Sequence, residues 1–204
     1  MLTASSLVAA TLLGAAIGLA LERFAALLSE GLPTLGRRAA LSAALAGAVA
    51  PLLALSAESK AQLVPAAALL CVLFIAALTD LETRRIPNRL TGGGLLVMIA
   101  LTALFEPRFA TERFLFALLV FAFFLAAALA RPGGLGFGDV KLVTVIGAAL
   151  GAASIVAIGF ALLIGALVGA AIALARGWRH ARAIALPLAP FLAAGSALTL
   201  LFGG

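Results

Sequence analysis

The sequence predicts an all-α membrane protein, a polytopic bundle of about eight transmembrane helices. Three observations predict it: 65% of the 204 residues are hydrophobic, only 11% are charged, and the mean hydropathy is +1.25. A soluble domain averages about 45–50% apolar and about 25% charged residues. The 14 basic and 8 acidic side chains cannot cover a globular surface, which excludes a soluble enzyme, a disordered tail and a coiled coil.

The individual helices are predicted from apolar runs that short charged segments separate. Their Ala and Leu content favours helix, and strict alternation, the mark of a membrane β-barrel, is absent. Most of the runs approach the length of about 20 residues that a transmembrane helix needs. The runs cover about 3–21, 39–56, 61–79, 90–105, 114–130, 142–175 and 183–202.

The long run 142–175 is interpreted as two helices with a turn near 151–154. A single helix of that length would reach about 51 Å, against about 30 Å of hydrocarbon. Basic residues concentrate in cytoplasmic loops. With two helices, all but three of the 14 Lys and Arg residues share the side of the loop 80–89, the exceptions being Lys60, Arg108 and Arg113. This distribution predicts eight passes, a cytoplasmic loop 80–89 and both termini outside.

The chain is expected to divide into two N-terminal transmembrane helices, within residues 1–60, and a core of residues 61–204. Three glycine pairs in the spacing that lets helices approach closely are interpreted as packing positions: Gly14/Gly18, Gly147/Gly151 and Gly165/Gly169. The single cysteine, Cys71, excludes an intrachain disulfide and a cysteine-only metal site. The net charge of +6 is attributed to membrane topology, so no nucleic-acid partner is expected.

The chemistry of the chain is expected to lie in its two aspartates, Asp80 and Asp139. Asp80 ends the third run, and Asp139 precedes the long run. Two predicted crossings separate them, so both lie at the same membrane surface. Two neighbouring carboxyl groups do not both ionise easily, and one is pushed to keep a proton. Such a pair can perform general acid–base hydrolysis, in which one group activates water and the other polarises a carbonyl.

Other roles remain open at this point. A lone aspartate at a helix end is often a cap, and Asp139 could be the N-cap of the next helix. Both aspartates could instead bind ions in a small transporter, although their position at run boundaries beside basic residues argues against this. Gly136 and Gly138 allow the backbone to approach a substrate strand closely, and Pro87 is expected to end any helix that continues past Asp80.

The surroundings of the two aspartates closely resemble the type IV prepilin peptidase family, bacterial membrane aspartic proteases with a GxGD motif. The similarity rests on Asp80 followed by Arg85-Ile86-Pro87-Asn88, and on Gly136-Phe137-Gly138-Asp139-Val140-Lys141-Leu142. It extends to the Pro-rich entry to the last helix, Pro187-Leu188-Ala189-Pro190-Phe191-Leu192-Ala193-Ala194-Gly195. The resemblance implies that Asp80 and Asp139 are the catalytic pair. Residues beside them are expected to contact substrate, namely Arg85, Pro87, Asn88, Gly136, Gly138 and Lys141.

The resemblance further implies a multi-pass protein of the bacterial inner membrane, surrounded by lipid, that needs no cofactor or metal. It would cleave the short leader from type IV or Flp-type prepilins or pseudopilins at the cytoplasmic face. Bifunctional members also N-methylate the new terminus and carry a zinc-binding domain with paired Cys-x-x-Cys motifs. Residues 21–39 contain no cysteine, so the chain resembles the peptidase-only members that serve Flp-type pili.

Two alternatives to an active prepilin peptidase are a presenilin-type protease and a catalytically silent subunit. The presenilin group of GxGD proteases uses a Tyr-Asp motif, and this chain has no tyrosine. A catalytically silent subunit of a secretion system would keep the fold without the activity; the two intact aspartates argue against it. The sequence leaves the oligomeric state open.

Overall fold

The computed structural model describes residues 4–28, 50, 60–131, 134–178 and 186–202. Every element in these ranges is helical, which confirms the predicted fold class. The predicted run 39–56 falls almost entirely outside the described residues. The elements are α1 (Ala4–Leu28), α3 (Lys60–Thr83), α4 (Asn88–Phe105), the 3-10 helix η1 (Pro107–Phe109), α5 (Ala110–Ala130), α6 (Phe137–Leu150), α7 (Ala153–Arg176) and α9 (Ala189–Phe202).

Four helical segments among the described residues are long and apolar enough to cross a membrane: Gln62–Thr83, Asn88–Phe105, Pro107–Ala130 and Ala153–Arg176. Helix α9 is apolar but shorter. Helix α6 has only 14 residues, which corresponds to about 21 Å of helix. The chain is therefore a multi-pass membrane protein. The described residues do not establish the predicted number of eight passes.

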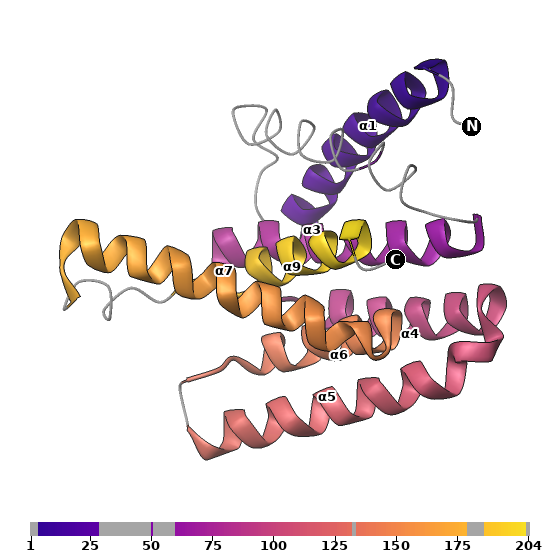
Figure 1. Ribbon diagram of the computed structural model, residues 1–204. Helices are drawn as coiled ribbons and strands as arrows, with labels where there is room; N and C mark the ends of the chain where they lie inside the picture. The colour runs from indigo at the N-terminus through magenta and orange to yellow at the C-terminus, as the bar shows by residue number, and fades with distance from the viewer. Residues whose placement is uncertain (1–3, 29–49, 51–59, 132–133, 179–185, 203–204) are drawn as a thin grey trace.

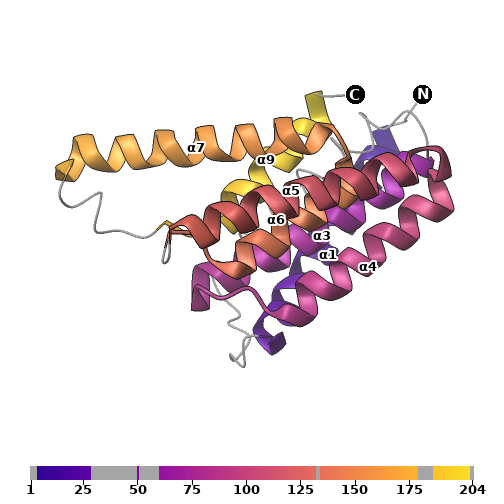
Figure 2. The same ribbon diagram turned by 90° about the horizontal axis from the view of Figure 1, so that it is seen from below.

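Successive helices from α3 onward run in alternating directions, and the C-terminal end of α3 lies at the same end of the bundle as the N-terminal end of α6 (Figure 1). Helix α6 is the centre of the fold, since residues 142–149 along it are all buried. Helices α3, α4, α5 and α9 surround α6, whereas the C-terminal part of α7 extends beyond the other helices (Figure 2).

The break between α6 and α7 confirms the prediction that residues 142–175 form two helices. Gly151 has a φ of +55°, a conformation that side-chain-bearing residues rarely adopt. A Cβ atom at this position would lie 2.7 Å from Oε1 of Glu112. That same carboxylate oxygen accepts a hydrogen bond from the backbone N–H of Ala152, at 3.1 Å. Gly151 is thus the turn itself, and it also approaches α5 closely, as does Gly147, where a Cβ atom would lie 2.9 Å from Cα of Ala117.

Polar contacts also join α4, α5 and α6 beside the turn at Gly151, at the end of the bundle opposite the aspartates. Arg113 of α5 forms a 2.7 Å ion pair with Glu106, which follows α4. Arg113 also donates to Thr102 Oγ1 at 3.4 Å, and Thr102 in turn donates to the carbonyl of Ala148 in α6. The contacts satisfy polar groups at a partly buried helix junction, where unpaired groups would be costly.

Helices α7 and α9 approach so closely that one glycine is required between them. A Cβ atom on Gly195 would contact the carbonyl oxygen of Ala157 and would lie 2.7 Å from the backbone nitrogen of Ala161. Backbone atoms cannot yield as a flexible side chain does, so the helices would have to separate. The close packing at Gly195 leaves no local pattern in the sequence, because the surface that it contacts lies on a different helix.

We expect Gly195→Ala to lower the melting temperature of the purified protein in detergent by several degrees, since overpacking costs about 1–3 kcal/mol. Gly159→Ala on α7 is the matched control, because a Cβ atom there meets nothing within 4 Å. The control should be neutral or mildly stabilising, since alanine favours helix by up to about 1 kcal/mol over glycine. Equal melting temperatures for the two variants would contradict the packing argument.

Candidate active site

Asp80 lies in the last turn of α3, and only 7% of it is exposed. The predicted apolar run ended at residue 79, but the helix continues to Thr83, so Asp80 is helical and not a loop residue. Its Oδ2 atom accepts a hydrogen bond from the backbone N–H of Ala189, at 3.1 Å. Ala189 is the first residue of α9. The first N–H groups of a helix lack internal partners, and they favour a negative charge.

Arg84 shapes the end of α3 and adds a positive charge beside Asp80. It has a φ of 52°, in the left-handed region, and its backbone N–H donates to the carbonyl of Asp80 at 2.9 Å. The charge of Arg84 acts on the Asp80 carboxylate. The expectation that Pro87 ends this helix is wrong, because α3 has already ended at Thr83. Pro87 instead occupies the N-cap position of α4, with an extended ψ of 133°.

Asp139 lies in the first turn of α6 and is partly buried. The suggestion that Asp139 is the N-cap is wrong: Gly136 is the N-cap, and Asp139 is the third residue of the helix. The side chain turns back toward the helix start, since a Cβ atom on Gly136 would lie 3.1 Å from Oδ2 of Asp139. A side chain at this position can accept a hydrogen bond from the N-cap backbone, as in a capping box.

The two aspartates interact with each other. Burial, and after it the negative charge of Asp80, raise the pKa of Asp139 from 3.8 to about 6. The Gly136 backbone N–H opposes this by lowering the pKa. This interaction and the shared end of the bundle place both aspartates at one end of the molecule, as the two helices between them predict. Each carboxyl group therefore influences whether the other is ionised.

Two contacts hold the start of α6 against the segment 84–88, which joins α3 to α4. A Cβ atom on Gly138 would lie 3.2 Å from Cβ of Ile86, so glycine allows the loop to press onto α6. Lys141 Nζ donates to Oδ1 of Asn88 at 2.9 Å and lies 4.5 Å from the ring centroid of Phe137. These contacts hold the first turn of α6, and with it Asp139, against the loop that follows Asp80.

The expected substrate-contacting residues therefore fall into two groups. Gly136, Gly138, Lys141, Asn88 and Pro87 make contacts within the protein or begin a helix, while Arg85 is exposed in the segment between α3 and α4. No group of three His, Cys, Asp or Glu side chains that could hold a metal occurs within the described ranges.

Three residues contribute to the site in ways that the sequence did not predict: Ala189, Arg84 and Ile86. Arg84 could have been found from its spacing of four residues from Asp80, which places opposite charges together at a helix end. Ile86 could not have been assigned, because its role depends on the absent Cβ of Gly138. Ala189 contributes a backbone N–H, which leaves no side-chain signal in the sequence.

Comparison with known proteins decides the family. Residues 67–174 match the model of the type IV leader peptidase family. The chain belongs to the type IV leader peptidase family. A curated relative, the prepilin leader peptidase/N-methyltransferase of Bacillus subtilis (strain 168), is 38% identical over 143 residues, which cover 70% of this chain and 57% of that protein. No solved structure matches the chain.

The leader peptidase match includes both aspartates and the motifs around them, but it ends within α7. Helix α9 and Ala189 lie beyond the matched residues. The link between α9 and Asp80 consists of the 3.1 Å hydrogen bond and the packing of α9 against α3. The chain spans little more than half the length of this curated relative.

Proposed function

We propose that this chain is a membrane-embedded aspartic endopeptidase that removes the short leader from type IV or Flp-type prepilins or pseudopilins. The observation that carries the proposal is the pair of aspartates at one end of the bundle, where burial and the charge of Asp80 raise the pKa of Asp139 to about 6. Membership of the leader peptidase family supports it. The active site would act at the cytoplasmic face of the bacterial inner membrane.

The environment of each aspartate supports a separate role in hydrolysis. We assign water activation to Asp80, because its carboxylate accepts the hydrogen bond from the Ala189 N–H. Asp139 keeps its proton and donates a hydrogen bond to the scissile carbonyl oxygen, so that water attacks the carbonyl carbon. The tetrahedral intermediate then collapses as the proton on Asp80 passes to the leaving amine. This is general acid–base catalysis without a covalent intermediate.

The residues around the aspartates would position the substrate. Arg85 and Gly136 are exposed and would contact the leader directly. Pro87, Asn88, Gly138 and Lys141 would shape the surface on which the leader lies. A transporter or ion-binding role is less well supported, because a backbone N–H points at the Asp80 carboxylate. A cation site would instead surround that group with oxygen atoms.

The proposed topology is eight passes, with residues 1–60 forming two helices before a protease core of 61–204. We expect a reporter fused within 84–89 to report a cytoplasmic location and one fused within 106–113 a periplasmic one. The physical reason is the concentration of basic residues on one side of the membrane. A periplasmic signal from the 84–89 fusion would overturn the proposed orientation.

The experiment that tests the proposed function is cleavage by the purified protein. The protein, reconstituted in vesicles, is incubated with a prepilin that carries its leader and apolar segment, and the product is separated by size. The proposal predicts a single cut directly before the apolar segment. An unchanged prepilin, across a panel that includes Flp-type pilins and pseudopilins, would contradict it.

The product is expected to carry an unmethylated N-terminus, because we propose that this chain lacks N-methyltransferase activity. A structural zinc site takes four ligands, and the sequence contains one cysteine, Cys71. Mass spectrometry of the product, with the methyl donor S-adenosylmethionine present, checks this. A methyl group added by the purified protein would refute the peptidase-only assignment while leaving the peptidase assignment intact.

A further inference from the structure

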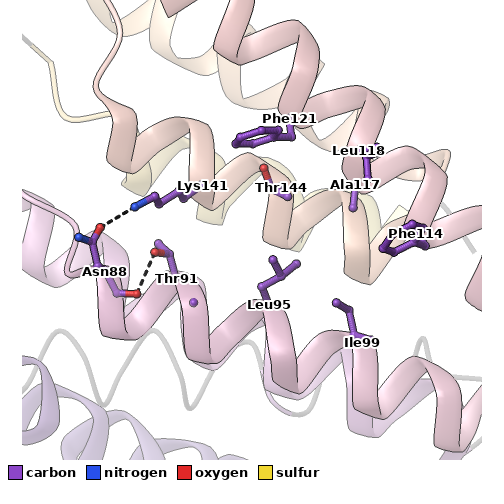
Figure 3. Close-up of a pocket in the computed structure, with 11 residues that line it drawn as sticks. Asn88, Thr91, Leu95, Ile99, Phe114, Ala117, Leu118, Phe121, Lys141 and Thr144 are labelled. Carbon is purple, nitrogen blue, oxygen red and sulfur yellow. Dashed lines mark hydrogen bonds between the residues drawn. The ribbon is translucent and has the colours of Figure 1, made fainter.

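A second candidate site is a groove of about 370 Å³ between α4, α5 and α6. Its walls carry apolar side chains from two helices, including Leu95 of α4 and Phe114 and Leu118 of α5. Lys141 and Asn88 lie together at one end of the groove, and Phe114 lies at the other (Figure 3). The aspartate pair does not line this groove.

The interior of the groove is chemically apolar, although two threonines line it. Thr91 Oγ1 donates to the carbonyl of Asn88 at 3.3 Å, and Thr144 Oγ1 donates to the carbonyl of Val140 at 2.8 Å. Both hydroxyl protons are therefore used within their own helices. Polar character is left at one end, where the Lys141 ammonium donates one of its three protons to Asn88.

An elongated apolar groove with a positive charge at one end fits an amphiphile with an anionic head. None of the residues that line the groove is acidic, so the Lys141 charge is not neutralised from within it. An α-helix with its side chains is about 10–12 Å across, and a membrane-spanning one would need several times the volume of the groove. A single acyl chain is thin enough to enter.

We propose that this groove binds one acyl chain of an anionic phospholipid, with the lipid phosphate at Lys141. Basic pockets between transmembrane helices at the cytoplasmic side are a known setting for anionic head groups. Lysine binds phosphate as a point charge. Neither aspartate lines the groove, but Lys141 and Asn88 do, so the lipid phosphate would lie beside the surface proposed for the leader.

Gly92 keeps the groove open. It lines the groove, and a Cβ atom there would meet nothing within 4 Å. Gly94 differs, because a Cβ atom on it would lie 2.9 Å from a methyl group of Val72, so packing against α3 explains that glycine. Gly93 has the same open surroundings as Gly92 but does not line the groove. Leucine at residue 92 would project into the groove without a backbone clash.

The test uses phosphatidylglycerol with a photoreactive diazirine in its acyl chain, added to the full-length protein in nanodiscs. Cross-linked peptides are mapped by mass spectrometry. We expect label on the groove-lining parts of α4, α5 and α6, with a preference over the matching phosphatidylcholine probe of roughly fivefold for one basic residue. Lys141→Gln should remove that preference.

Gly92→Leu should reduce groove labelling at least tenfold, whereas Gly93→Leu, with the same gain in helix propensity, should leave it unchanged. Labelling of the exposed face of α7 serves as the internal reference for each variant. Equal groove labelling in the two leucine variants, or no preference for phosphatidylglycerol in the unmodified protein, would overturn the proposal. Displacement of the lipid label by an apolar substrate peptide that itself cross-links at the groove would assign the groove to protein instead.

Discussion

Asp80→Asn and Asp139→Asn are each expected to reduce prepilin cleavage by at least about 10²-fold, the lower end of the general acid–base contribution. Asparagine keeps nearly the same shape, and its carbonyl oxygen can accept the hydrogen bond that Ala189 donates to Asp80. The substitution removes the titrating proton and the negative charge. Initial rates of cleavage, measured with equal amounts of folded protein in vesicles, check the expectation.

Glu82→Gln is the matched control for the aspartate variants. Glu82 lies two residues from Asp80 on α3 but is exposed, whereas Asp80 is buried. The same carboxylate-to-amide change should therefore leave most of the activity. Near wild-type cleavage by Asp139→Asn, or a Glu82→Gln variant as inactive as Asp80→Asn, would show that the aspartate pair has been misassigned.

Folding measurements on Asp139→Asn separate a catalytic role from a purely structural one. The pKa of Asp139 is raised from 3.8 to about 6, so the folded state binds this proton more tightly than the unfolded state. The resulting stabilisation is present at low pH and is lost as the pH rises through about 6. Asp139→Asn should therefore not lower the melting temperature at pH 8. A helix-capping role alone would predict a clear loss of stability.

Cleavage is expected to slow as the pH rises above about 6, because Asp139 is proposed to act in its protonated form and its pKa is raised to about 6. Above this pKa the protonated fraction, and with it kcat/KM, falls about tenfold for each pH unit. The apparent value belongs to the aspartate pair. A substrate whose own groups do not titrate between pH 5 and 8 keeps the profile interpretable.

The same pKa can be followed without activity. In Asp80→Asn the like charge is gone, so the pKa of Asp139 should fall, as read from its carboxyl infrared band. Burial, the larger cause of the shift, remains in that variant. A cleavage rate that rises through pH 6, or an Asp139 pKa unaffected by Asp80→Asn, would contradict the assigned roles.

The sequence predicted the features that depend on the length of the apolar runs, on the positions of the basic residues and on the number of membrane crossings between two residues. The turn at Gly151 followed from a run too long for one membrane crossing and from the distribution of basic residues. The placement of Asp80 and Asp139 at one end followed from the two crossings between them. Both arguments use properties that a helix in a membrane imposes on any sequence, so they needed no knowledge of side-chain contacts.

The remaining features depend on contacts between distant segments. Hydropathy marked the end of the apolar run at residue 79, but helix α3 continues to Thr83, since polar residues are compatible with helix outside the apolar region. The bond from Ala189 to Asp80 joins residues 109 positions apart through a backbone group. The requirement for glycine at residue 195 likewise depends on where the backbone of α7 lies. No local pattern encodes such contacts.

The most direct test of the central claim compares kcat/KM for Asp80→Asn, Asp139→Asn and the double variant on one prepilin substrate. If the two carboxyl groups act as a single unit, either substitution removes the acid–base pair, and the double variant should be no slower than the slower single variant. If the groups act independently, their losses should multiply in the double variant. Equal rates are the result predicted here, and multiplied losses would contradict the account of a coupled aspartate pair.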